Sequence, residues 1–313
     1  MSYTKGLHEV ADGVWAYLQP HGRWGWSNAG LITGDDDSLL VDTLFDLRLT
    51  AEMLEQMRAV APASRRISAV VNTHANGDHC YGNALVAESE IISTARCAEE
   101  MLQLPPATMA AMAAMLRSTD SFGAVGPFLR RIFSPFLFED VPLALPTRTF
   151  ERQLDLRVGG RAVSLLEVGP AHTAGDAVFH LVDHGVVFTG DILFHGGHPI
   201  VWSGPVAHWI AACDRILDLR PSVVVPGHGP LARPEALVDL KGYFELLTRE
   251  ARPRFDAGMT PLQAARDLDL GPYSGWSEPE RVVANVHALF RDFGDPSPAD
   301  ALSLMGEMAA LAG

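Results

Sequence analysis

Histidines and aspartates recur directly after strand-like apolar runs, and this series constrains the fold more than any other feature of the chain. Four segments carry it: HANGDH at 74–79, PAHTAGD at 170–176, FTGD at 188–191 and PGHGP at 226–230. They contain four histidines and two acids in comparable positions, namely His74, His79, His172, His228, Asp78 and Asp191. Imidazole and carboxylate are common ligands of divalent metals, and α/β proteins place their chemistry on loops at strand ends. These six residues are therefore candidate metal ligands, although for the first segment taken alone a pair of histidines that caps a helix is an equal alternative.

The apolar pattern between these segments predicts strands in both halves of the chain. The expected strands are the runs at 13–19, 28–33, 38–43, 68–73, 154–158, 161–169, 177–183, 185–191 and 222–230. A helix is expected from Leu47 to Val60, with Met53, Leu54 and Met57 on one face. From Pro234 onward the spacing of apolar residues is mostly helical. Two halves of strands followed by helices predict an α/β fold, in which two sheets pack together with helices outside.

A segment rich in methionine and phenylalanine interrupts this pattern between about residues 100 and 140. The methionines recur at helical spacing, and the phenylalanines follow among glycines and prolines. One interpretation is a helical hairpin that packs a small core of its own. The other is a lid or pocket wall for a bulky apolar ligand, because these side chains adapt to irregular shapes. Both interpretations can hold together.

Composition and charge disfavour several classes of function. A formal net charge of -14 over 313 residues disfavours binding to nucleic acid and to an anionic membrane surface. No stretch approaches the length of an apolar membrane span. The three cysteines include no CxxC pair, and the N-terminal residues show no apolar signal region, so we expect a cytoplasmic protein. Cys80, which directly follows the first segment, is expected to be a small buried residue.

Taken together and in this order, the four segments resemble the metallo-β-lactamase superfamily over about residues 10 to 230. The resemblance implies an αββα sandwich with a metal cleft at one edge. By position, it implies two sets of ligands: His74, His172 and Asp191 for one metal, and Asp78, His79, His228 and the same Asp191 for the second. Asp78 would also orient a water molecule and carry its proton. An aspartate at 191, where lactamases place a cysteine, indicates the hydrolase branch.

Asn76 departs from the pattern, because it occupies the position of the superfamily's second histidine. An amide oxygen is neutral and less basic than imidazole, so Asn76 would be a weak ligand or only a neighbour of the first metal. Three outcomes stay open: one metal in the second site, two metals with a weakly held first one, or a degenerate site. Zinc is the expected metal, with manganese or iron as alternatives.

Further segments are similar to the metallo-β-lactamase-fold cyclases of bacterial aromatic polyketide pathways. They include WGWSNAGLI, TGDILFHGGHPIVWSGPVAHW and the C-terminal PERVVANVHALF. This resemblance implies aldol ring closure on a poly-β-ketone with release of a thioester. It extends into the helical tail, so we expect a metallo-β-lactamase-like domain at 1–232 and a helical extension at 233–313 packed on it. Candidate substrate contacts near the cleft are His195, His198, Trp26 and Trp202.

The sequence therefore predicts a metal-dependent hydrolase of an acyl ester or thioester, or a cyclase-thioesterase, acting through a metal-activated water. The substrate would be small, apolar or aromatic, and linked to a carrier protein or to CoA. Two other classes stay open: an iron-dependent oxidoreductase such as a sulfur dioxygenase, and a non-catalytic small-molecule binder with a degenerate site. The sequence indicates no oligomeric state.

Overall fold

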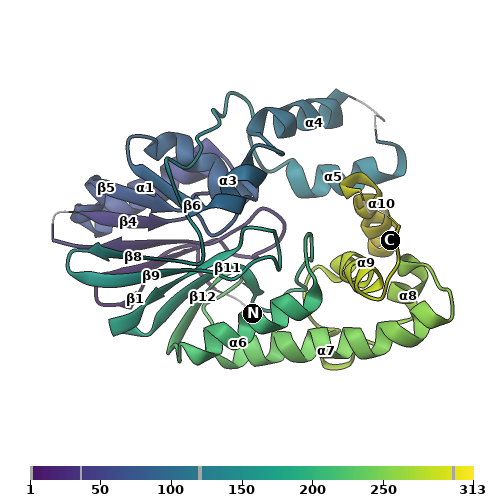
Figure 1. The fold of residues 1–313 in the computed structure, drawn as a ribbon. Coiled ribbons are helices and arrows are strands. Elements are labelled where there is room, and N and C mark those ends of the chain that lie inside the picture. The colour runs from purple at the N-terminus through teal and green to yellow at the C-terminus, as the bar shows by residue number, and fades with distance from the viewer. Residues whose placement is uncertain (1–2, 36, 119–121, 298–299) are drawn as a thin grey trace.

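The computed structural model describes residues 3–35, 37–118, 122–297 and 300–313. Two mixed sheets pack face to face, and helices cover the outer face of each (Figure 1). The first sheet has the order β1-β2-β3-β4-β5-β6-β7, and the second has the order β12-β11-β10-β9-β8. This αββα sandwich confirms the fold class predicted from the sequence.

The first sheet contains β1 (Gly6–Ala11), β2 (Val14–Leu18), β3 (Ala29–Thr33), β4 (Ser38–Val41), β5 (Ile67–Val71), β6 (Glu90–Thr94) and β7 (Arg148–Phe150). The second contains β8 (Gln153–Val158), β9 (Arg161–Glu167), β10 (Ala177–Leu181), β11 (Val186–Phe194) and β12 (Val223–His228). Strands β4 to β7 run parallel, as do β11 and β12, and the other neighbours are antiparallel. Strands β1, β6 and β7 were not expected from the sequence.

The helices are α1 (Leu47–Val60), α2 (Gly77–Cys80), α3 (Ala95–Met101), α4 (Pro106–Ser118), α5 (Gly126–Phe133), α6 (Val206–Asp218), α7 (Glu235–Asp256), α8 (Pro261–Asp267), α9 (Val282–Asp292) and α10 (Ala301–Ala312). Helix α1 has the bounds predicted from the sequence. Asp46 caps it by accepting a hydrogen bond from the backbone N–H of Leu49 at 2.7 Å. Its apolar face, with Met53 and Met57 fully buried, packs on the first sheet because the sheet offers a matching apolar surface.

The core lies in three layers. Between the sheets, side chains such as Ile32, Leu39, Phe179 and Phe188 are at most 2 % exposed. Outside the first sheet, α1 and the loop after α5 enclose a second cluster. Outside the second sheet, α6 to α10 share one continuous apolar cluster with β10, β11 and β12. The C-terminal helices therefore pack on the sandwich without a separate core.

The segment expected as a helical insertion contains α4 and α5 and continues as an irregular loop through residue 147. In Figure 1, α5 lies beside the C-terminal helix α10 and α4 lies next to α5, at the side of the sandwich away from β1. Insertion and tail thus come together although they are far apart in the sequence. Among the described residues, no helix has both the length and the apolar character needed to cross a bilayer.

Candidate metal centre

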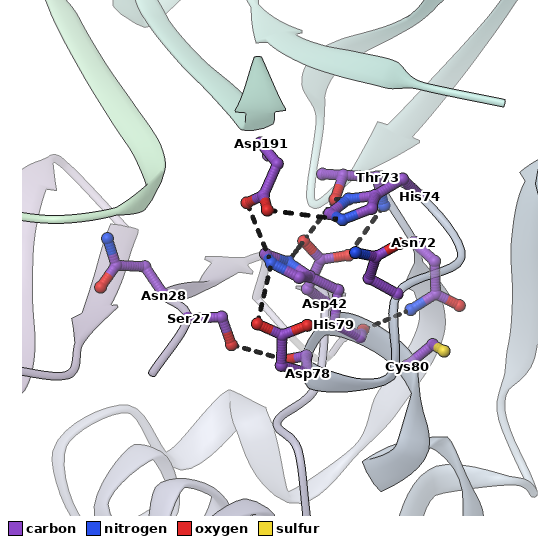
Figure 2. A network of polar contacts seen from close by, with 12 residues as sticks. Ser27, Asn28, Asp42, Asn72, Thr73, His74, Asp78, His79, Cys80 and Asp191 are labelled. Atoms are coloured by element: carbon purple, nitrogen blue, oxygen red, sulfur yellow. Dashed lines mark hydrogen bonds and ion pairs between the residues drawn. The ribbon is translucent and has the colours of Figure 1, made fainter. Parts of the chain in front are cut away.

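The six residues predicted as metal ligands come together at one edge of the sandwich. His74 follows β5, Asp78 and His79 lie on α2, His172 lies on the loop between β9 and β10, Asp191 lies on β11, and His228 ends β12. The C-terminal ends of β5, β11 and β12 meet at this edge, so the loops that follow them converge. Figure 2 shows Asp191 approaching His74 and His79 from one side and Asp78 approaching from the other.

Distances within this group are short. Oδ1 of Asp191 lies 3.1 Å from Nε2 of His79, and Oδ2 lies 3.4 Å from Nε2 of His228 and 3.7 Å from Nε2 of His74. Oδ2 of Asp78 lies 3.3 Å from Nε2 of His228 and 3.9 Å from Nε2 of His79. Two triads, His74–His79–Asp191 and Asp78–His79–His228, each place one possible ligand atom per residue within 4.8 Å of the others. These side chains are at most 11 % exposed.

His172 and Asn76 meet at the same place. Nε2 of His172 lies 3.4 Å from Oδ2 of Asp191 and 3.3 Å from Nδ2 of Asn76. Because Nδ1 of His172 faces the carbonyl oxygen of Ile200 at 2.7 Å, Nδ1 carries the proton and Nε2 carries the lone pair. The amide of Asn76, as oriented, donates to that lone pair, so Asn76 lies beside the centre and competes for one of the predicted ligand atoms.

Each of the four imidazoles is held through its other nitrogen. The oxygens that face Nδ1 are Oγ1 of Thr73 for His74 at 3.0 Å, Oδ2 of Asp42 for His79 at 2.9 Å, the Ile200 carbonyl for His172 at 2.7 Å, and the Trp26 carbonyl for His228 at 3.1 Å. Such contacts select the tautomer and aim Nε2 at the centre, as is usual for metal-binding histidines.

Two glycines allow the close approach of these loops. A Cβ on Gly227 would lie 2.0 Å from Oδ1 of Asp191, so a side chain here would displace the carboxylate. Gly190 has φ +50°, and a Cβ there would lie 2.5 Å from the side chain of Thr73. The left-handed backbone at Gly190 is accessible to glycine at little cost.

Electrostatics give Asp191 and His74 the protonation states that a cation requires, whereas His79 favours its protonated form, whose proton a cation would have to displace. Burial raises the pKa of Asp191, but the neighbouring His228 and His79 outweigh it and hold that pKa well below its usual value. Burial, reinforced by the charge of His79, lowers the pKa of His74 well below 6.5. Burial also lowers the pKa of His79, but Asp191 and Asp78 outweigh it and raise that pKa. At neutral pH, Asp191 is thus a carboxylate and His74 is a neutral imidazole, both competent ligands.

The residues fit a divalent cation. Three buried atoms, Nε2 of His74, Nε2 of His79 and Oδ1 of Asp191, have no well-formed hydrogen bond among the described residues. Buried polar atoms normally have partners, and these three point at one another instead. Because imidazole nitrogen and carboxylate oxygen suit zinc, manganese and iron alike, the donor set identifies a divalent metal without selecting one.

A cavity of about 390 Å³ opens directly onto this group. Asn76, Asp78, His172, Asp191 and His228 line its floor. Its walls are largely apolar, and they come from several distant parts of the chain: Trp24, Phe45, Tyr81, Met109 of α4, Phe133 of α5, Trp202 and Met305 of α10. Met109 and Phe133 of the segment rich in methionine and phenylalanine line the cavity, as a pocket wall would. Phe128 and Phe136 are buried in two clusters shared with the rest of the fold, so the segment does not pack a core of its own.

The four predicted substrate contacts have different positions. Trp202 lines the cavity. His195 lines a neighbouring cavity of about 410 Å³, which it shares with His228. Trp26 packs on Phe136 and contributes its carbonyl oxygen to His228. His198 is fully buried between aromatic rings, behind the cavity wall. Only Trp202 of these four therefore lies where it can contact a molecule next to Asp191.

Two residues of the site were not foreseen. Asp42 follows β4, accepts hydrogen bonds from the backbone N–H and Oγ1 of Thr73, both at 2.7 Å, and contacts His79. Its position in SLLVDT, an acid at a strand end, was a usable signal. Arg281, which precedes α9, is 2 % exposed and lines the cavity. No local pattern marks it, because the tail reaches the site only in the folded chain. Cys80 is buried as expected.

Comparison with known proteins agrees with this geometry. A sequence profile of the metallo-beta-lactamase superfamily matches residues 22–228. The chain belongs to this superfamily. It is 28 % identical over 264 residues to a linear primary-alkylsulfatase of a Pseudomonas species. The alignment covers 72 % of this chain and 48 % of that protein, so this chain spans about half of that relative's length. It is 26 % identical over 218 residues to the acyl-coenzyme A thioesterase MBLAC2 of Gallus gallus, covering 64 % of this chain and 72 % of that one.

Among solved structures, the metallo-beta-lactamase family protein TTHA1429 from Thermus thermophilus superimposes with a TM-score of 0.65 at 18 % identity, covering 94 % of this chain and 98 % of that one. The shared fold therefore includes the C-terminal helices as well as the sandwich. This superfamily consists largely of metallohydrolases, and this chain retains paired groups of histidine and aspartate that could hold metal ions.

Proposed function

We propose that this protein is a metal-dependent hydrolase of acyl esters or thioesters with a small apolar or aromatic acyl group. The observation that carries the proposal is the convergence of four imidazole Nε2 atoms and two carboxylates on the floor of a largely apolar cavity. Hydrolases among its relatives, including the acyl-coenzyme A thioesterase, support it. That relative also favours CoA or a carrier protein as the leaving group.

Asp78, His79, His228 and Asp191 are the proposed main ligands, because Nε2 of His228 lies within 3.4 Å of carboxylate oxygens of both Asp78 and Asp191, Nε2 of His79 lies 3.1 Å from Asp191, and Asn76 engages none of the four. A divalent cation held there would lower the pKa of a water molecule towards neutrality and polarise the substrate carbonyl. Zinc is the proposed metal, since this mixed nitrogen and oxygen set suits it well.

The chain's own residues have separate tasks. Asp78 is 8 % exposed and faces the cavity, so its carboxylate can take a proton from the attacking water and return it to the departing alcohol or thiol. Asp42 keeps His79 in one tautomer. Apolar walls from Phe45 and Phe133 bind the acyl group and exclude bulk water from the floor.

Elemental analysis and turnover test the proposal. The purified protein should contain at least one metal ion per chain and should release CoA from an apolar acyl-CoA. Asp191→Asn should lower turnover about 100-fold or more, since it removes a proposed ligand. The matched control Asp183→Asn, at an exposed position, should leave turnover unchanged. A protein that binds no zinc, manganese or iron after reconstitution would contradict the proposal.

Asn76 gives a second test. Asn76→His removes the amide that faces His172 and supplies a further imidazole. We expect the number of bound metals per chain to rise, as measured by elemental analysis after equilibration with excess zinc. Unchanged stoichiometry and affinity would show that Asn76 does not limit the first site.

Other activities have distinct signatures. Bound iron with oxygen-dependent turnover would indicate an oxidoreductase, and tight small-molecule binding that survives chelation without any ester cleavage would indicate a binding protein. Ring closure on a poly-β-ketone, the reaction implied by the resemblance to polyketide cyclases, would appear as a cyclised product in place of the free acid.

A further inference from the structure

Arg281 is a buried cation in the wall of the cavity. It ends a short 3-10 turn (Pro279–Arg281) and precedes α9, yet it lines the same cavity as Asp78 and Asp191. Only 2 % of the residue is exposed. Trp24 and Phe194 flank the guanidinium, with ring centroids 4.3 and 5.0 Å from Cζ. The side chain is therefore held firmly and has little access to water outside the cavity.

The hydrogen-bonding capacity of Arg281 is mostly unused. Nη1 donates to the carbonyl oxygen of His198 at 3.1 Å, while Nε has no partner among the described residues. A guanidinium has five N–H donors. One neutral acceptor and two aromatic faces leave most of this donor set free.

The nearest acids on its own turn have other partners. Glu280 accepts from Nε1 of Trp24 at 3.2 Å and lies 3.5 Å from Arg131. Glu278 lies 3.5 Å from Arg23. Within the described part of the chain, no carboxylate approaches Arg281 to the 4.0 Å of an ion pair. Burial lowers the pKa of Arg281, and the negative charges of Glu278 and Asp191 act against this, so the group stays a cation.

A buried charge without an ionic partner is costly unless something else pairs with it. The carboxylates on the cavity floor are engaged with histidines and, on the proposed function, with a cation. A ligand could supply the anionic group in direct contact that Arg281 lacks among the described residues. Guanidinium binds carboxylate and sulfate well, because its parallel N–H groups match two oxygens of such a group.

We propose that Arg281 binds an anionic group, a carboxylate or a sulfate, on a substrate whose remainder is apolar. The apolar part would lie against Phe45, Met109 and Phe133, which line the same cavity. This inference rests on the proposed function in one respect, namely that the cavity is the substrate site, and it adds a charge requirement to that substrate. Neutral acyl groups of the same size would bind more weakly.

Binding of three probes with one chain length tests the proposal: octanoate, octyl sulfate and 1-octanol. Quenching of tryptophan fluorescence should report binding, because Trp24 stacks on Arg281 and Trp202 lines the cavity. At least one anion should bind roughly 10- to 100-fold more tightly than octanol, as expected for a charge-assisted hydrogen bond. Whichever anion shows the preference identifies the group. The preference should persist after chelation, since a metal can also bind carboxylate.

Arg281→Gln should abolish the preference for anions and leave octanol binding unchanged, and Arg281→Lys should retain part of it. Arg131→Gln is the matched control, because Arg131 contacts the same Glu280 but is exposed and lies outside this cavity. A merely structural role would lower the unfolding midpoint of the Arg281 variants without changing the ratio of affinities. Equal affinities for octanol and both anions in the parent protein would overturn the proposal without any variant.

The two proposals can fail separately. A chain that cleaves neutral acyl thioesters but shows no anion preference would remove the role of Arg281 alone. A chain that cleaves no ester or thioester but binds anions through Arg281 would remove the proposed hydrolysis alone.

Discussion

Acid should destabilise the protein through His198, and His198→Phe should remove that effect. The imidazole is fully buried, and neither ring nitrogen has a hydrogen-bond partner among the described residues. It packs against Tyr243 and Trp276, with centroids 5.3 and 5.8 Å away. Burial, and next the charge of Arg281, lower the pKa of His198 from 6.5 to about 4. The folded protein therefore holds this histidine neutral.

The direction of this pH dependence follows from proton binding at His198. Between pH 6.5 and about 4, the unfolded chain binds a proton at His198 and the folded chain does not, so stability rises with pH across this window. The stabilisation is complete above pH 6.5 and is lost as pH falls through the folded pKa. Each pH unit corresponds to about 1.4 kcal/mol, so the loss from pH 7 to pH 4 is about 3 kcal/mol.

Urea unfolding at pH 7 and pH 4, with a chelator present, measures this effect. His198→Phe keeps an aromatic ring in the cluster and has no titrating group. From pH 7 to pH 4, the free energy of unfolding should therefore fall by about 3 kcal/mol more in the parent than in the variant. At pH 7 the variant should be equally or more stable, because two unpartnered polar atoms are gone. His208→Gln, on the exposed face of α6, should retain the parent's pH dependence. Identical losses in His198→Phe and the parent would refute the reasoning.

Three further substitutions test particular contacts. An asparagine at position 42 cannot accept hydrogen bonds from all the donors that face Asp42, so Asp42→Asn should leave His79 less well oriented. Zinc affinity, measured by competition with a chelator, should then fall about 10- to 100-fold. An unchanged affinity would contradict this. Gly227→Ala places a methyl group where Oδ1 of Asp191 lies, so metal content should drop in elemental analysis. Gly275→Ala, at a position without a left-handed backbone and with no atom within 4 Å of the added Cβ, should leave it unaltered. Asp46→Ala removes the N-cap of α1 and should lower the free energy of unfolding by about 1 to 2 kcal/mol in urea titrations, whereas no change would show that the cap is dispensable.

Much of the fold was predictable because its signals are local. Helix α1 was predicted to the residue, since its apolar spacing lies within the segment itself. Strands β5, β11 and β12 were recognisable as apolar runs. Strands β1 and β7 were not, because their side chains are partly exposed and their pairing depends on neighbours elsewhere in the sheet.

The sequence by itself determined which side chains could form the centre, because His74 directly follows an expected apolar strand, Asp191 and His228 lie at the ends of two others, and the loops at strand ends converge in such folds. Only the tertiary structure decided what surrounds them. Asp42 contacts His79, which lies 37 residues away in the sequence, and Arg281 of the C-terminal tail lines the cavity. Contacts of this kind depend on the path of the whole chain, since burial and close approach are properties of packed elements and leave no periodic signal in the sequence.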